Sequence, residues 1–148
     1  EWAGSYRHYH AAMFRTMVFG DVPDRQKEMY SVAYDALMAV EDTLRPGNTI
    51  GQVFSAHADV MDKAGMQEHR LNACGYSLGT TYAPNWMDWP MLYADNPVVV
   101  EPGMVYFCHM ILFDSERQLA MCLGETVLTT DGAAERLSRS SLDLVHQP

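Results

Sequence analysis

The sequence has few cysteines and no cysteine motif. Its three cysteines, Cys74, Cys108 and Cys122, lie far apart, and no two of them form a Cys-x-x-Cys pair. An odd number of scattered cysteines does not make a disulfide framework, and the spacing excludes the usual zinc motifs. We therefore expect reduced, buried thiols in a cytoplasmic protein.

Positive charge and long apolar runs are also scarce. The chain has 10 lysines and arginines against 19 aspartates and glutamates, which gives a formal net charge of −9. Because the basic residues are scattered singly, no basic stripe is available for phosphates, and nucleic acid is not an expected partner. An acidic surface also repels anionic membranes, and no run of about 18 apolar residues could span one.

Apolar sequence is sufficient for one core. Hydrophobic residues make up 48% of the 148 residues, as expected for a domain of ordinary size. Glu1 is followed at once by strand-like sequence. We expect residues 1–148 to be most of a single domain that forms the C-terminal part of a longer chain.

Two helices are predicted in the first half of the chain. Apolar residues recur at helical spacing from Met29 to Leu44, and Pro46-Gly47 ends that pattern. Thr49 and Gln52 form a capping box at the start of a second helix, which we expect to end at Gly65.

Strands are predicted on both sides of these helices. Residues 1–19 indicate two strands or one bent strand, and further strands are expected at 98–100, 104–113 and 119–129. Residues 80–97 hold three prolines and two tryptophans and are interpreted as a long ordered loop. The order of strands, two helices and strands is typical of an α+β fold with an antiparallel sheet.

Four short segments carry a resemblance to a known family. They are Tyr6 to Thr16, Gly75-Tyr76-Ser77-Leu78-Gly79, Glu101-Pro102-Gly103-Met104-Val105 and Gly124 to Thr130. With the two helices between them, they resemble the pita-bread superfamily of creatinase, prolidase, aminopeptidase P and methionine aminopeptidase. The resemblance implies a curved antiparallel sheet flanked by helices, a C-terminal catalytic domain and a homodimer that acts on a small-molecule substrate.

The resemblance also locates the positions of a metal site. Metal-binding members hold two ions with Asp, Asp, His, Glu and Glu, and these positions fall on Glu1, Ala12, Tyr76, His109 and, with a spacing one residue short, Glu125. Alanine cannot ligate, and a tyrosine with an ordinary pKa near ~10 is a poor neutral ligand. We therefore expect no metal cofactor. The alternative is a single divalent ion such as manganese, iron, zinc or cobalt, held by the remaining side chains with His10 nearby.

Three details are closest to the metal-independent branch of creatinase and ectoine hydrolase. They are Arg7-x-Tyr9-His10, the Gly75-Tyr76 turn and Tyr82-Ala83-Pro84-Asn85-Trp86. This similarity implies a catalytic set and a substrate-binding set. The catalytic set is Glu1, His10, His109 and Glu125, and the substrate-binding set is Tyr76, Tyr82 and Trp86.

The residue types suggest how such a site could work. A carboxylate at Glu1 can act as nucleophile or general base, and His10 can move a proton. A buried imidazole at His109 needs a partner, and Glu125 is the expected one. Tyr76 can donate a hydrogen bond to developing negative charge. Each residue also has a structural interpretation: a terminal residue, a packed aromatic ring or a satisfied core histidine.

Three functions follow as hypotheses. The first is a metal-independent hydrolase that cleaves a C–N bond in a small polar metabolite such as a cyclic amidine, a guanidino compound or a short amide. The second is a metal-dependent Xaa-Pro aminopeptidase or dipeptidase, against which the replaced ligands argue. The third is a catalytically inactive pita-bread domain that binds a peptide.

Overall fold

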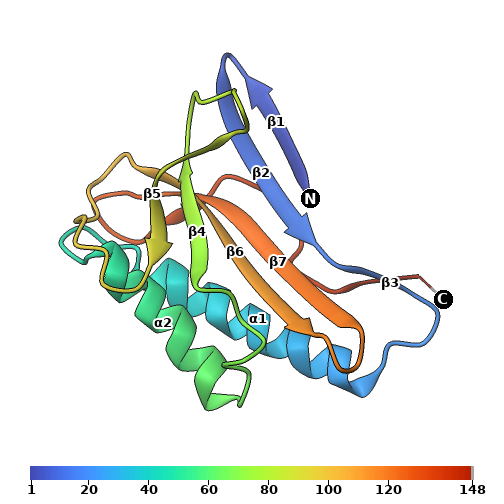
Figure 1. Cartoon of the computed structure of the whole chain (residues 1–148). Helices are drawn as coiled ribbons and strands as arrows, with labels where there is room; N and C mark the ends of the chain where they lie inside the picture. Colours follow the sequence, from blue (N-terminus) through green and yellow to red (C-terminus); the bar gives the residue numbers. More distant parts are fainter. Residues whose placement is uncertain (148) are drawn as a thin grey trace.

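The computed structural model describes residues 1–147 as one curved, mainly antiparallel sheet with two helices packed on one face (Figure 1). The strands of the main sheet lie in the order β1-β2-β7-β6-β4-β5, and β8 pairs with β7. The predicted α+β architecture is therefore confirmed. No helix in this part of the chain is long and apolar enough to cross a membrane.

The two helices agree with the apolar pattern. Helix α1 spans Asp24–Thr43 and buries one face, while α2 spans Ile50–Lys63. The predicted capping box is present, because the Thr49 hydroxyl accepts from the Gln52 backbone N–H and the Gln52 side chain accepts from the Thr49 N–H. Gly65 follows α2 with φ of +72°, a conformation that favours glycine and ends the helix.

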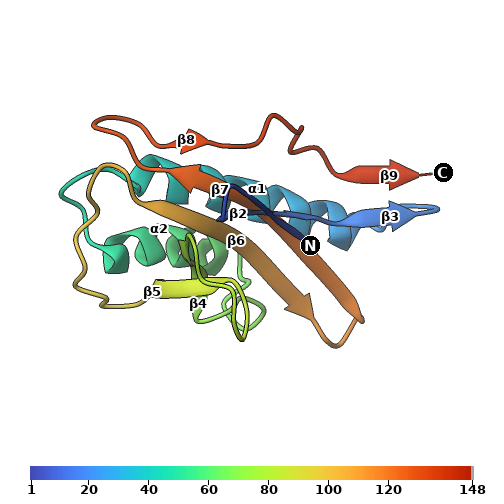
Figure 2. The same cartoon turned by 90° about the horizontal axis from the view of Figure 1, so that it is seen from above.

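The first nineteen residues form three strands. β1 (Trp2–Tyr6) and β2 (Tyr9–Arg15) make an antiparallel hairpin that projects from the body of the molecule, as Figure 1 shows. β3 (Met17–Phe19) leaves the main sheet and pairs in parallel with β9 (Val145–Gln147), far along the chain (Figure 2). A contact between such distant segments has no local sequence signal, so it was not predicted.

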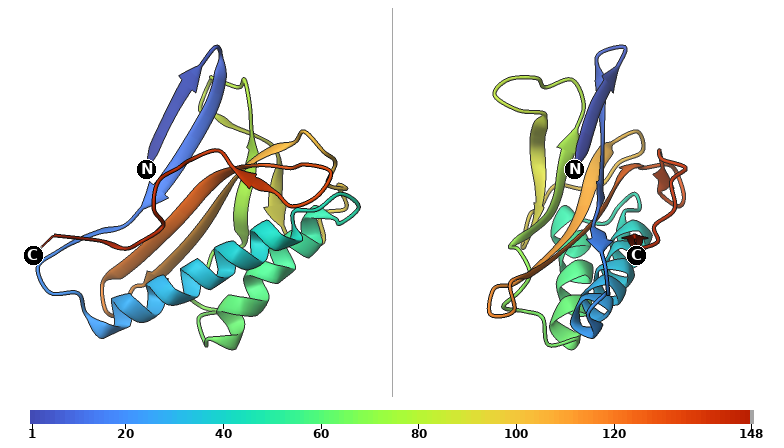
Figure 3. Two further views of the ribbon diagram at one scale, coloured as in Figure 1. Left: turned by 180° about the vertical axis from the view of Figure 1, so that it is seen from behind. Right: turned by 90° about the vertical axis from the view of Figure 1, so that its right-hand side faces the viewer.

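The centre of the sheet is the hairpin of β6 (Val105–Asp114) and β7 (Leu119–Leu128), close to its predicted bounds. β4 (Ala73–Leu78) pairs with the other side of β6, and the short β8 (Glu135–Arg136) pairs with β7. Helix α1 crosses this hairpin, and α2 packs beside it against β5 and β4 on the same face of the sheet (Figure 3).

Two strand predictions were wrong. The supposed loop contains β5 (Met87–Tyr93), which pairs with β4 at the edge of the sheet. Pro90 and the tryptophans made this segment look like a loop. An edge strand tolerates a proline, because the backbone on its outer side has no partner strand to which an N–H must donate. The expected strand at 98–100 makes only an isolated bridge between Val99 and Thr49.

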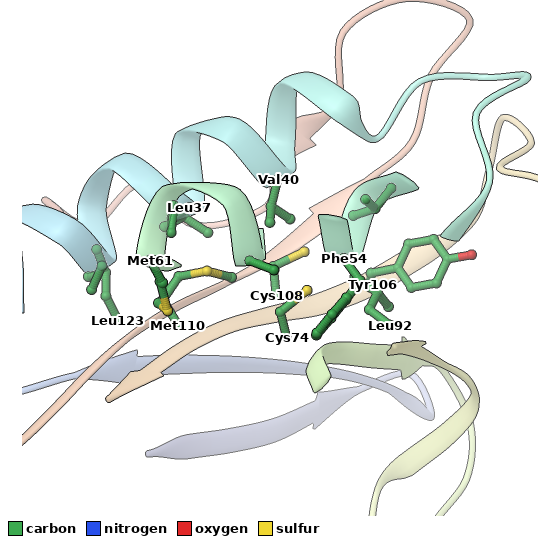
Figure 4. Close-up of a cluster of buried hydrophobic side chains, with 14 of the residues drawn as sticks. Leu37, Val40, Phe54, Met61, Cys74, Leu92, Tyr106, Cys108, Met110 and Leu123 are labelled. Atoms are coloured by element: carbon green, nitrogen blue, oxygen red, sulfur yellow. The ribbon is translucent and has the colours of Figure 1, made fainter. Parts of the chain in front are cut away.

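The main core lies between the helices and the sheet. Its members come from both helices and four strands, as Figure 4 shows: Leu37, Val40, Phe54, Met61, Cys74, Leu92, Tyr106, Cys108, Met110 and Leu123. Cys74 and Cys108 are free and fully buried, as predicted from the sequence, whereas Cys122 is free but only partly buried. The opposite face of the sheet carries a second, smaller apolar cluster of Ala12, Tyr76, Leu78 and Phe107.

Candidate active site

A pocket of about 370 Å³ lies on the face of the sheet opposite the helices. Its size and mainly apolar lining are typical of small-molecule sites. The residues that line it come from β2, β4, β5, β6 and the segments beside them: Glu1, Phe14, Leu71, Ala73, Tyr76, Asn85, Trp86, Met87, Met91, His109 and Ile111. Four residues of the sequence-derived set, Glu1, Tyr76, Trp86 and His109, therefore meet in one pocket.

Strand alternation explains how β6 serves both faces of the sheet. Tyr106, Cys108 and Met110 pack into the core beneath the helices, whereas His109 and Ile111 line the pocket. Successive side chains of a strand point to opposite faces, so one strand can build the core and the site together. The register between β4 and β6 pairs Tyr76 with Phe107 and so fixes the position of the tyrosine along the sheet.

Tyr76 is the centre of a short hydrogen-bond chain. The Trp86 indole N–H donates to the Tyr76 hydroxyl at 2.9 Å, and that hydroxyl faces a Glu1 carboxylate oxygen at 3.5 Å. Burial raises the pKa of Tyr76 to about 12, against a smaller lowering by Trp86. The phenol therefore keeps its proton at neutral pH. Because the Tyr76 hydroxyl oxygen accepts the Trp86 N–H, the hydroxyl proton is free to point towards Glu1 or towards a ligand between Tyr76 and Glu1.

His109 is a neutral imidazole in this pocket. Its residue is only 7% exposed, and its ring centroid lies 5.6 Å from that of Tyr76. Burial lowers the pKa of His109 to about 4. Its Nδ1 atom is buried and has no hydrogen-bond partner among the described residues. The side chain is thus uncharged at pH 7 and can accept a proton or a hydrogen bond.

The stability of the protein should fall in mild acid because of two buried histidines. Burial lowers the pKa of both His57 and His109 to about 4, below their usual 6.5. Between these values the unfolded chain binds protons that the folded chain does not, so stability falls as the pH decreases. We expect a loss of about 1.4 kcal/mol per pH unit for each histidine between about pH 6.5 and 5. Urea unfolding of the parent and His109→Gln across this range checks it, because the variant should show a shallower slope.

The predicted His109–Glu125 couple is wrong. In the β6–β7 register Cys108 pairs with Glu125, whereas His109 pairs with Gly124. Paired residues share a face, so Glu125 lies on the side opposite His109. Its carboxylate forms a buried ion pair with Arg15 and accepts from the Ser138 hydroxyl at 3.1 Å. Glu125 departs by one residue from the spacing that the family resemblance implies. A shift of one residue along a strand turns a side chain to the opposite face of the sheet.

The position opposite His109 has no room for a side chain. A Cβ at Gly124 would lie 2.9 Å from the Cys108 carbonyl oxygen and 3.1 Å from the Phe107 ring. On the neighbouring strand, Ala12 packs with Tyr76 and Phe107 and carries only a methyl group. Two strand positions on this face of the sheet therefore offer no ligating atom.

His10 and Tyr82 contact each other away from the pocket, with ring centroids 4.4 Å apart and ring planes tilted by 55°. Neither residue lines it, and Tyr82 is 51% exposed. His10 lies four residues before Phe14 on β2, a separation of roughly 13 Å along a strand. The structure does not bring these two residues together with Glu1 and His109, which weakens the roles predicted for them.

Some of the pocket residues were missed in the sequence. Ile111 could have been found, because it follows His109 by two residues on the same strand and must share its face. Asn85 and Met91 reach the pocket through the pairing of β5 with β4. The interpretation of this segment as a loop concealed that pairing.

The donor set does not fit a metal ion. Within residues 1–147, no three His, Cys, Asp or Glu side chains lie close enough together to hold one. The single-ion alternative required Glu125, which is engaged with Arg15 on the other face of the sheet. Divalent ions need several converging carboxylate or imidazole ligands, and this pocket supplies only Glu1 and His109.

Comparison with known proteins agrees with the fold. The chain is 30% identical over 139 residues to the ectoine hydrolase of Halomonas elongata, which covers 93% of this chain and 34% of that protein. It is 23% identical over 140 residues to an Xaa-Pro dipeptidase of Pyrococcus furiosus, covering 95% and 39% respectively. The chain therefore spans a little over a third of the length of these relatives.

The structural comparison leads to the same group of proteins. The crystal structure of the dipeptidase PepE from Mycobacterium ulcerans superposes with a TM-score of 0.89 at 24% identity, over 97% of this chain and 38% of that one. This similarity confirms the predicted pita-bread fold. The family model described as metallopeptidase family M24 matches residues 1–131. The chain accordingly belongs to metallopeptidase family M24.

Proposed function

We propose that the protein is a hydrolase that cleaves a C–N bond in a small polar metabolite without a metal ion. One observation carries this proposal. A carboxylate, a protonated phenol and a neutral imidazole line one apolar pocket, from Glu1, Tyr76 and His109. These groups suit proton transfer and hydrogen bonding, whereas the pocket lacks the ligand set of a two-metal site. The similarity to a protein named ectoine hydrolase supports the substrate class.

The roles follow from the chemistry of each group. Glu1 acts as general base, taking a proton from the water that adds to the scissile carbon, or as the nucleophile itself. Tyr76 donates its proton in a hydrogen bond to the atom on which negative charge develops. His109, neutral and facing the same space, receives the proton that Glu1 has taken from water and passes it to the leaving nitrogen, so that Glu1 is again a carboxylate at the end of the cycle. Trp86 orients the Tyr76 hydroxyl through the 2.9 Å hydrogen bond.

The full-length protein should contain less than stoichiometric manganese, iron, zinc or cobalt after purification. The reason is that Ala12 and Gly124 offer no ligating atom and Tyr76 is a poor ligand, which leaves too few anionic donors near Glu1 and His109. Elemental analysis measures the content directly. Activity should also survive treatment with a chelator. Two tightly held ions per chain, lost together with activity, would restore the metallopeptidase hypothesis.

Trp86→Ala should raise the Michaelis constant for a small cyclic or cationic amide by about tenfold, equivalent to ~1.4 kcal/mol. The substitution removes one aromatic wall of the pocket and the hydrogen bond to Tyr76. Steady-state kinetics provide the measurement. Trp89→Ala is the matched control, because Trp89 is 62% exposed and lies outside the pocket.

Xaa-Pro dipeptides should not be hydrolysed by the parent protein or by Trp86→Ala. Efficient cleavage of these dipeptides by the parent would favour the dipeptidase hypothesis over the proposed reaction. A folded protein that hydrolyses neither small amides, amidines and guanidino compounds nor dipeptides would favour the inactive peptide-binding domain.

A further inference from the structure

The loop of residues 79–86 joins β4 to β5 and is held at two points. It lies beside the β1–β2 hairpin, as Figure 1 shows, and the His10 N–H of that hairpin donates to the Gly79 carbonyl at 2.9 Å. Across the loop, the Thr81 hydroxyl donates to the Asp88 carboxylate on β5 at 2.9 Å. These two hydrogen bonds restrict the directions in which the loop presents its side chains to the pocket.

Asn85 belongs to this loop and lines the pocket with its amide in a defined orientation. Its Oδ1 atom accepts from the Met87 N–H at 2.9 Å. Only the oxygen of an asparagine amide can accept from a backbone N–H, so this bond assigns the amide oxygen and nitrogen. The Nδ2 group donates to no residue in the described part of the chain. Because Asn85 is exposed, its two N–H donors lie at the mouth of the pocket.

The other polar groups of the lining are directed at the catalytic centre. The Trp86 indole N–H donates to the Tyr76 hydroxyl, which in turn faces Glu1. Neutral His109 carries a proton in the proposed reaction. The remaining lining side chains are apolar. Asn85 is therefore the lining side chain whose donors remain for a part of the ligand that does not react.

A donor at the mouth of the pocket discriminates between ligands by the group that they place beside it. An oxygen acceptor there replaces the water bound to the amide, and such a hydrogen bond changes affinity by about three- to tenfold. An apolar group at the same position displaces that water and returns no hydrogen bond. Since the amide is uncharged, the oxygen acceptor can belong to a carbonyl or to a carboxylate group.

We propose that Asn85 determines the specificity of this pocket. Its Nδ2 group donates to a second oxygen acceptor of the ligand, a carbonyl or carboxylate oxygen apart from the bond that is cleaved. This inference rests on the proposed function only in taking this pocket as the active site. It adds a second point of attachment, which orients the ligand between the mouth of the pocket and Tyr76.

Three probes built on one six-membered ring test this recognition without turnover, because none of them contains a C–N bond. Cyclohexanone has one oxygen acceptor, 1,4-cyclohexanedione has a second carbonyl, and 4-oxocyclohexanecarboxylate has a carboxylate in its place. In titrations of the full-length protein at pH 7, at least one two-acceptor probe should bind about threefold or more tightly than cyclohexanone. The tighter of the two identifies the acceptor. Binding is followed through the Trp86 indole N–H resonance, which is assigned by its loss in Trp86→Phe.

Asn85→Asp separates recognition from loop structure. An aspartate oxygen still accepts the Met87 N–H, but the two N–H donors are replaced by an acceptor. The preference for two-acceptor probes should disappear, while cyclohexanone affinity stays within about twofold and the melting temperature is unchanged. Asn85→Ala removes the donors without adding charge and should lose the preference as well. Asn72→Asp is the matched control, because it adds the same charge at an exposed asparagine outside the lining and should keep the preference.

The inference is overturned if the parent prefers neither two-acceptor probe, if the preference survives in either Asn85 variant, if Asn72→Asp loses it equally, or if no probe shifts the Trp86 resonance. The proposed hydrolase can fail separately. Selection through Asn85 in a protein that hydrolyses no C–N bond would support the inference and overturn the enzymatic proposal. An active hydrolase that binds the three probes equally would do the reverse.

Discussion

Glu125→Gln is expected to lower the free energy of unfolding by about 3 kcal/mol, because it breaks a buried ion pair and leaves one charge without its partner. The Glu125 side chain is fully buried, and that of Arg15 is only 5% exposed. A carboxylate at a catalytic position would instead be replaced by glutamine with little effect on stability. Chemical denaturation of the full-length protein at pH 7 measures the difference.

The control removes both charges of the pair. In Arg15→Met/Glu125→Gln no unpaired guanidinium remains, so most of the loss should be recovered, apart from the hydrogen bonds that Arg15 donates to the Gly124 and Ser141 carbonyls. Folded Glu125→Gln should keep its catalytic constant within a few-fold. A large loss of turnover with unchanged stability would return Glu125 to the catalytic set.

Glu1→Gln is expected to reduce the catalytic constant by at least about 100-fold, equal to ~2.7 kcal/mol of transition-state stabilisation. Glutamine keeps the shape of the side chain but can neither take a proton from water nor attack carbon. The Glu1 residue is exposed and lies at the edge of the pocket, so the melting temperature should change little. Steady-state kinetics and a thermal melt of the same sample provide the two readings.

Two further variants make this result specific. Tyr76→Phe removes the hydroxyl that faces Glu1 and should lower turnover while the rest of the ring remains packed against Phe107, with ring centroids 5.4 Å apart in the parent. Glu101→Gln should behave like the parent, because Glu101 is an exposed carboxylate outside the pocket. If Glu1→Gln remains within about threefold of the parent, Glu1 is not the base or nucleophile, and the site must be reassigned.

The helices were predictable because their signals are local. The apolar face of α1 and the capping box at Thr49 depend on residues within a few positions of each other. The β6–β7 hairpin was predictable for the same reason. β5 was not, since its identity depends on a partner strand about ten residues away and on an edge position that tolerates Pro90. β3 and β9 pair across more than a hundred residues, where no sequence pattern indicates a contact.

The site shows the same division. Residue type and the family resemblance were sufficient to select Glu1, Tyr76, Trp86 and His109, and all four line one pocket. They were not sufficient for Glu125, whose face depends on strand register rather than on its neighbours in sequence. A shift of one residue reverses the face of every side chain on a strand. His10 and Tyr82 were displaced by a similar geometric cause, because they lie further along the projecting hairpin and the adjoining loop.

The amino-acid sequence thus specified the fold class, the helices and the types of chemical group available, because these depend on composition and short-range spacing. The three-dimensional arrangement assigned each group to a face of the sheet. It turned Arg15 and Glu125 towards each other and left Glu1 as the one charged side chain among the described residues that line the pocket. Charge in a pocket is a sum over residues distant in the chain, so it emerges only when register and packing bring them together.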